Sequence, residues 1–173
     1  MSGRGLDIGY RGEHGDENII PVLPDAVGVD LDYPGYDGVR LPFPDHSQDY
    51  VFASHILEHI QTKNVSSVIQ DWARVVRPGG HIIIAVPHRD LYEKQRHLPS
   101  RWNLGHHRLY TAGSLLWEVE TALPDVHAYR VRECYDNDKD FNYSTPPEKH
   151  SSGCYEVVCV LEIEPKIIWE GAR

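Results

Sequence analysis

Leu6-Asp7-Ile8-Gly9 stands near the start of a chain of 173 residues and joins a short apolar run to a glycine. A glycine after a buried strand allows a sharp turn and lets a ligand approach the backbone closely. A second apolar run, 26–32, carries Asp30 near its end. An acidic side chain in that place can accept hydrogen bonds from both hydroxyls of a ribose. Neither feature is specific by itself, because glycine turns after strands are common and acidic strand ends are often simply solvated.

Strands and helices alternate along the rest of the chain. Short apolar runs typical of buried strands lie at 5–9, 26–32, 49–54, 81–87, 128–135 and 155–163. A helix is expected from Val65 to Val76, with Asn64 as its N-cap and Arg77-Pro78-Gly79-Gly80 as its end. A second amphipathic helix begins near Thr111.

This order predicts an α/β fold, a Rossmann-like three-layer sandwich with a mostly parallel sheet. The last two strands have no helix between them, so the last strand should run antiparallel. In an open α/β sheet, ligands bind beyond the carboxyl ends of the strands. Functional residues are therefore expected just after Ile8, Leu31, Ala53 and Val86.

Composition predicts one domain over residues 1–173 and disfavours two classes of partner. The net charge of -9 leaves no long-range basic field for nucleic acid or anionic lipid. The longest apolar run, 82–86, is too short to cross a membrane, and the first residues do not resemble a signal peptide, so a cytoplasmic location is expected. Cys134, Cys154 and Cys159 have neither the even count of a disulfide framework nor the spacing of a zinc site.

Five sequence blocks occur in an order that carries a family resemblance. They are Leu6-Asp7-Ile8-Gly9, Gly28-Val29-Asp30, Leu41-Pro42-Phe43-Pro44-Asp45, Ser54-His55-Ile56-Leu57-Glu58-His59 and Arg74-Val75-Val76-Arg77-Pro78-Gly79-Gly80. Over residues 5–123 the chain resembles the class I S-adenosylmethionine-dependent methyltransferases, in the type-11-like branch related to ubiquinone-biosynthesis methyltransferases. The resemblance implies S-adenosylmethionine as the cofactor.

The resemblance also implies which residues contact the cofactor. Asp7, Gly9 and Tyr10 would belong to the loop around its methionine part. Asp30 would hold the ribose, with Leu31 against the adenine. The remaining cofactor-binding positions implied by the family pattern are Asp37, Gly38 and Leu41 near the adenine, and Ser54 and His55 beneath the sulfonium.

The chain departs from the family pattern near the cofactor. Arg11 and Glu13 replace two glycines of the usual loop. The first helix would have to fit between Gly15 and Pro24, so it is expected to be one turn or absent. Only six residues separate Asp30 from Asp37, too few for the usual helix and third strand. We therefore expect a reduced sheet that lacks one edge strand and helix.

The connection 88–108 is the expected substrate side of the site. It holds five Lys or Arg and two acidic residues, a net charge of +3. It could form a pocket wall for an anionic or saccharide-like acceptor, or a solvated surface and subunit contact. If the acceptor is a hydroxyl, a histidine suits the role of base. His107, His55 and His59 are the candidates in that order, and a structural role is the alternative for each.

Two further segments carry subsidiary expectations. The loop 136–153 could fold over the site as a lid, and its aspartates Asp136, Asp138 and Asp140 are a reserve hypothesis for metal assistance. They lack the glycine and the final acid of a calcium loop, so no metal site is predicted. The apolar tail 167–169 could dock on the body or on a second subunit, which would make a homodimer.

The sequence thus predicts methyl transfer from S-adenosylmethionine to a small molecule, with a saccharide-like or anionic acceptor methylated on oxygen. The alternative is a catalytically idle domain that binds the cofactor or a partner protein. A nicotinamide dehydrogenase is disfavoured, because Arg11 and His14 stand where the second and third glycines of its fingerprint would fall.

Overall fold

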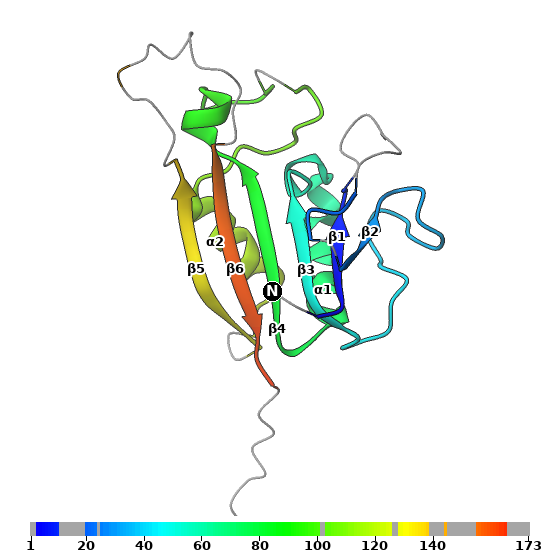
Figure 1. Ribbon diagram of the computed structural model, residues 1–173. Coiled ribbons are helices and arrows are strands. Elements are labelled where there is room, and N and C mark those ends of the chain that lie inside the picture. Colours follow the sequence, from blue (N-terminus) through cyan, green and yellow to red (C-terminus); the bar gives the residue numbers. More distant parts are fainter. Residues whose placement is uncertain are drawn as a thin grey trace, which may run out of the picture.

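In the part of the chain that the structure describes, one mixed sheet of six strands organises the fold (Figure 1). The computed structural model describes residues 3–10, 20–23, 25–100, 103–125, 128–138, 144 and 155–165. The strands are β1 (Gly5–Ile8), β2 (Ala26–Val29), β3 (Gln48–Ser54), β4 (Val76–Pro87), β5 (Tyr129–Asn137) and β6 (Glu156–Ile163). Their order in the sheet is β2-β1-β3-β4-β6-β5. The first four strands pair parallel, while β6 pairs antiparallel with both β4 and β5.

Two helices cover one face of this sheet and pack against each other (Figure 1). Helix α1 (Val65–Val75) turns Val68, Ile69 and Trp72 inward at helical spacing. Helix α2 (Ala112–Ala122) begins at Thr111, whose hydroxyl accepts the Ser114 amide while Ser114 caps the Thr111 amide in return. The apolar side chains of alternate strand positions meet these helices and form the core.

The fold class is confirmed, with differences in detail. β2 ends at Val29, before the end of the expected run 26–32. Asn64 precedes α1 as expected, but its side chain makes no capping hydrogen bond. The loop from 30 to 47 contains no strand, as the spacing of its acidic residues predicts. The expected first helix falls largely on residues outside the described ranges. Within the described ranges, both α-helices lie on the same face of the sheet. The helical layer expected on the other face is therefore not seen among the described residues.

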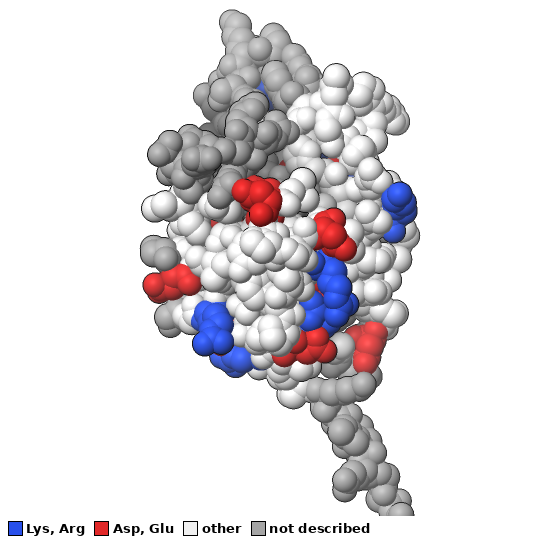
Figure 2. Space-filling model, turned by 90° about the vertical axis from the view of Figure 1, so that its right-hand side faces the viewer, with Lys and Arg blue, Asp and Glu red and all other residues white. Residues whose placement is uncertain are grey.

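The distribution of charged side chains on the surface agrees with the net charge of -9, which predicts no broad basic area. On the face seen in Figure 2, Lys and Arg form separate small areas beside acidic side chains and no continuous basic surface.

Among the described residues, no helix has the length and apolar character that crossing a membrane requires. Residues 139–143 and 145–154 of the expected lid and the tail 167–169 lie outside the described ranges.

Candidate functional site

The turn after β1 requires glycine at its corner. Gly9 has a φ of 71° and donates its amide to the carbonyl of Val29 over 2.7 Å. A Cβ atom at this position would lie 1.9 Å from the side chain of Ile56. Any other residue would be strained in φ and would displace Ile56. The turn thus brings the end of β1 against both the end of β2 and the segment that follows β3.

The loop after β2 presents acidic and apolar groups side by side. Leu31 is 73% exposed although it lies only two residues after Val29, which is fully buried. One carboxylate oxygen of Asp37 accepts the amides of Val39 at 2.9 Å and Arg40 at 2.6 Å. These backbone hydrogen bonds lower the pKa of Asp37, because they favour its ionised form.

A buried ion pair on α1 fixes that loop. Arg74 donates to the carbonyl oxygens of Leu41 at 2.9 Å and Phe43 at 2.8 Å. Its partner Asp71 accepts the Leu41 amide at 2.6 Å and pairs with the Arg74 guanidinium at 2.7 Å. Leu41 is therefore held in the core at 1% exposure, and the residues before it are positioned at the site.

A cavity of about 350 Å³ lies at the carboxyl edge between these loops. Its lining combines acidic and aliphatic side chains, and it consists of Ile8, Gly9, Asp30, Leu31, Tyr36, Asp37, Gly38, Val39, Ile56, His59, Ile60, Gln61 and Asn64. A flat apolar ring with an attached sugar diol matches that combination, with the exposed Leu31 among the lining residues. We call it the first cavity.

A second cavity of about 360 Å³ adjoins the first. The two share Gly9, Asp30, Leu31, Ile56 and His59. The second cavity adds Ser54, His55, Tyr92, Asn103 and His106 to its lining. It is therefore the histidine-rich half of one continuous site.

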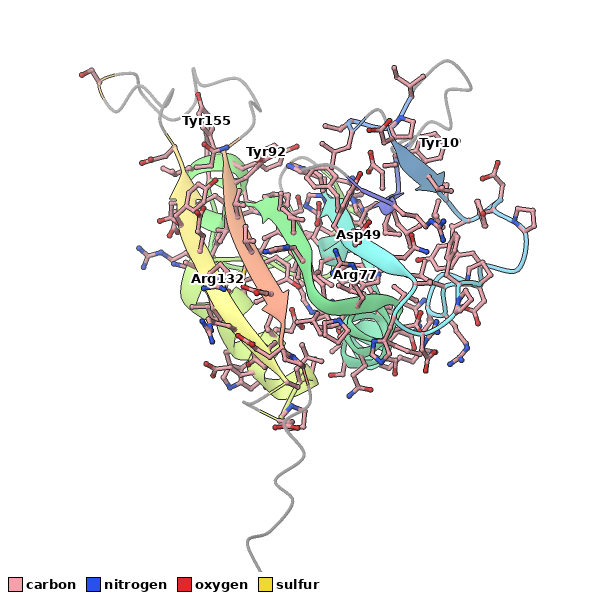
Figure 3. The ribbon with its side chains drawn as sticks, turned by 60° about the horizontal axis from the view of Figure 1, so that its bottom comes forward. Tyr10, Asp49, Arg77, Tyr92, Arg132 and Tyr155 are labelled. Atoms are coloured by element: carbon pink, nitrogen blue, oxygen red, sulfur yellow. The ribbon has the colours of Figure 1, made fainter. Side chains whose placement is uncertain are left out.

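His55 is held by both its backbone and its ring. Its φ of 56° lies in the left-handed region, which is uncommon for a histidine and typical of functional sites. Its Nε2 donates to the carboxylate of Glu156 at 3.0 Å, and its ring meets the edge of Tyr92 at 5.8 Å between centroids. Figure 3 shows Tyr92 and Tyr155 together at this end of the sheet. Burial alone would lower the pKa of His55, but the hydrogen bond to Glu156 and the charges of Glu58 and Glu156 raise it above its usual value.

Beneath His55 and His59 lies a set of buried polar groups. Glu58 is 0% exposed, and neither of its carboxylate oxygens has a hydrogen-bond partner among the described residues. Glu93, also 0% exposed, accepts the Ser100 hydroxyl at 2.5 Å and hydrogen-bonds Nδ1 of His106. Burial raises the pKa of Glu58 to about 7, against the opposing charges of His55 and His106.

The structure brings most of the predicted residues together. Those that line the two cavities are Gly9, Asp30, Leu31, Asp37, Gly38, Ser54, His55 and His59. Asp7, Tyr10 and Leu41 are not among the lining residues. Asp7 accepts the Val22 amide at 2.7 Å, and the ring of Tyr10 packs over Gly28. Figure 3 shows Tyr10 beside β2.

Among the candidate bases, His107 lies apart from the cavities. Its ring is exposed, and its amide donates to the carbonyl of Glu58 at 2.7 Å. The adjacent His106 is buried and lines the second cavity. Sequence reasoning missed His106, Glu58 and Glu93. The one signal available was the His-x-x-Glu-His spacing of residues 55–59 followed by the His106-His107 pair.

Three arginines of the connection 88–108 have acidic neighbours. Arg89 pairs with Asp90 at 2.9 Å, and Arg108 pairs with Glu118 at 2.7 Å while it also donates to the Ile60 carbonyl. Arg96 lies 3.9 Å from the same Asp90. The two carboxylates therefore compensate part of the charge of these three arginines, and Arg96 keeps most of its own.

Comparison with known proteins agrees with this geometry. Residues 23–84 match the family model of a methyltransferase domain. A protein of Mycolicibacterium smegmatis named "probable S-adenosylmethionine-dependent methyltransferase" is 29% identical over 132 residues, which are 68% of this chain and 50% of that protein. The chain thus spans about half the length of that relative. The resemblance to the class I S-adenosylmethionine-dependent methyltransferases is confirmed.

Solved methyltransferase structures share the fold at low identity. An N1-methyltransferase of Burkholderia thailandensis, solved with 1,6-didemethyltoxoflavin and S-adenosylhomocysteine, has a TM-score of 0.59 and 14% identity, covering 94% of this chain and 72% of that one. An S-adenosylmethionine-dependent methyltransferase of Archaeoglobus fulgidus has a TM-score of 0.58 and 17% identity, covering 92% and 85%. The finer placement in the ubiquinone-biosynthesis branch stays a prediction.

Proposed function

We propose that the protein transfers a methyl group from S-adenosylmethionine to an oxygen atom of a small molecule. The observation that carries the proposal is the pair of adjoining cavities at the carboxyl edge, one suited to a nucleoside and the other lined by histidines. Their shared residues at Gly9 and Asp30 would stand at the junction of cofactor and acceptor.

The residues of the first cavity fit the cofactor. The carboxylate of Asp30 would accept the ribose hydroxyls, and Leu31 would lie against the adenine ring. Asp37, kept ionised by two backbone amides, would receive the adenine amino group. When bound, S-adenosylmethionine supplies an electrophilic methyl group on a sulfonium.

The second cavity would align the acceptor. An oxygen lone pair of the acceptor forms the new bond to the methyl carbon while the carbon–sulfur bond breaks and its electron pair goes to sulfur. The hydroxyl proton must leave during this displacement, and His55 would take it on Nδ1 because its Nε2 is bonded to Glu156. His59 is the second candidate. Alignment and exclusion of water would supply most of the remaining acceleration.

The composition of the second cavity bears on the choice of acceptor. Among the described residues, no Lys or Arg lines the second cavity, so a saccharide-like hydroxyl acceptor fits better than a strongly anionic one. Tyr92 offers an aromatic face of the kind that packs on sugar rings.

Calorimetry with S-adenosylhomocysteine tests the cofactor half of the proposal. Wild type should bind, and Asp30→Ala should bind at least about tenfold more weakly because two charge-assisted hydrogen bonds to the ribose are lost. Asp32→Ala is the matched control, because Asp32 does not line either cavity. Absence of heat for wild type would refute the proposal.

Transfer of a labelled methyl group to a panel of hydroxyl-bearing acceptors tests the chemical half. Turnover with a saccharide is the expected result. Cofactor binding without turnover across the panel would favour the alternative, an idle domain that binds the cofactor.

A further inference from the structure

We infer that Glu58, His59 and His106, here called the Glu58 cluster, bind one divalent transition-metal ion at the floor of the second cavity. One ligand atom from each of the three residues lies within 4.8 Å of the others. His59 and His106 also line the second cavity, so an ion among them would face the bound acceptor.

The carboxylate of Glu58 is the first observation that points to an ion. It is 0% exposed, and both of its oxygens are buried with no hydrogen-bond partner in the described part of the chain. An ionised carboxylate buried in this way costs several kcal/mol unless a cation or a set of donors compensates it. A divalent cation would supply that compensation.

The imidazole nitrogens around Glu58 are the second observation. Oε1 of Glu58 lies 3.9 Å from Nε2 of His59 and 4.0 Å from Nε2 of His106. Both separations are too long for hydrogen bonds. Two donors bound to one zinc ion at its usual 2.0–2.1 Å stand roughly 3.3 Å apart in a tetrahedron. Binding one ion would therefore shorten each of these two separations by roughly 0.6–0.7 Å.

The surroundings of His106 prepare its ring for coordination. Glu93 is hydrogen-bonded to Nδ1 of His106 and also accepts the Ser100 hydroxyl. All three side chains are nearly or fully buried. With the proton held on Nδ1, the lone pair of Nε2 is left on the side of Glu58. A carboxylate behind a histidine in this way is the usual support of a metal-bound histidine.

The donor set selects the class of ion. Two imidazoles and one carboxylate suit zinc and its first-row neighbours better than magnesium or calcium, which prefer oxygen ligands. Three protein ligands leave at least one coordination position open, as in catalytic zinc sites. Resting on the proposed function, the open position would take the acceptor's hydroxyl oxygen and make its proton easier to remove.

Metal-binding measurements on the whole chain test this inference. The protein is stripped with a chelator and titrated with zinc chloride and, separately, manganese chloride in a calorimeter, and the metal retained after dialysis is measured by mass spectrometry. We expect wild type to retain one equivalent, Glu58→Gln to retain none, and Glu93→Gln to bind roughly 10–100-fold more weakly. His107→Ala should bind like wild type, because its ring lies outside the cluster one residue away.

The outcomes separate this inference from the proposed function. Failure of wild type to bind either ion, or equal affinity in wild type and Glu58→Gln, overturns the metal site. Circular dichroism shows whether each variant is folded. S-adenosylhomocysteine is titrated into the metal-free wild type in parallel. Zinc binding with the expected variant pattern but no S-adenosylhomocysteine binding would support the metal site and refute the proposed function.

Discussion

Replacing Glu58 with glutamine should make the metal-free protein more stable at high pH and change little at low pH. Burial raises the pKa of the Glu58 carboxyl from 4.5 to about 7 in the folded protein. A carboxyl with a raised pKa binds its proton more tightly when folded. Its stabilising effect is complete below the unfolded pKa and is lost as the pH rises through the folded value.

The size of the effect follows from the two pKa values. At 1.36 kcal/mol per pKa unit, the difference between 4.5 and about 7 corresponds to about 3 kcal/mol. Between pH 4.5 and pH 8, wild type should therefore lose about 3 kcal/mol relative to Glu58→Gln. Above pH 8 the difference should stay constant.

Urea unfolding in the presence of a chelator measures this difference directly. Other titrating groups are common to both proteins, so their contributions largely cancel in the difference of unfolding free energies. Glu164→Gln offers a control, since Glu164 forms an ion pair with Arg130 at the opposite end of the sheet. A stability difference that does not change with pH would refute the assignment of Glu58 as a buried, uncompensated carboxyl.

Three more substitutions probe the framework of the site. Gly9→Ala should lower the unfolding free energy by about 1–2 kcal/mol, because the φ of 71° is unfavourable for alanine; unchanged urea stability would contradict this. Arg74→Ala should cost about 3 kcal/mol by the same assay, since buried Asp71 loses its partner, and a loss under 1 kcal/mol would argue against a stabilising role of the Asp71–Arg74 ion pair. Glu156→Gln should lower the pKa of His55, followed by NMR titration of the ring, because burial then acts with less opposition; a pKa that stays raised would exclude Glu156 as the cause.

Local sequence patterns predicted most elements of the fold. The helical spacing of Val68, Ile69 and Trp72 and the stop at Pro78 placed α1 to within one residue. Thr111 was correctly expected at the start of α2, because its hydroxyl caps the first turn. The short span from Asp30 to Asp37 correctly indicated a missing strand. These features depend on neighbouring residues, which is why one sequence suffices for them.

The arrangement of the buried polar groups depended on contacts that the sequence does not display. His106 and His107 are adjacent and chemically identical, and their separation into a buried and an exposed ring follows from the packing of Glu93 and Ser100. Glu93 belongs to the π-helical turn Arg89–Glu93, which no simple periodicity indicates. Charged residues are rarely fully buried, so composition gave no reason to place Glu58 and Glu93 inside.

The exposure of Leu31 has a consequence for how the protein would be handled. An aliphatic side chain that is 73% exposed in the lining of a nucleoside-sized cavity leaves apolar surface in water until a ring covers it. If the proposed function is correct, the adenine ring of the bound cofactor would cover the apolar surface of Leu31 and shield it from water. Occupancy would then be linked to folding, and a ligand at 100 times its Kd adds about 2.7 kcal/mol to the unfolding free energy. The melting temperature should therefore report S-adenosylhomocysteine concentration, and purification without the cofactor would yield the molecule in its least stable form.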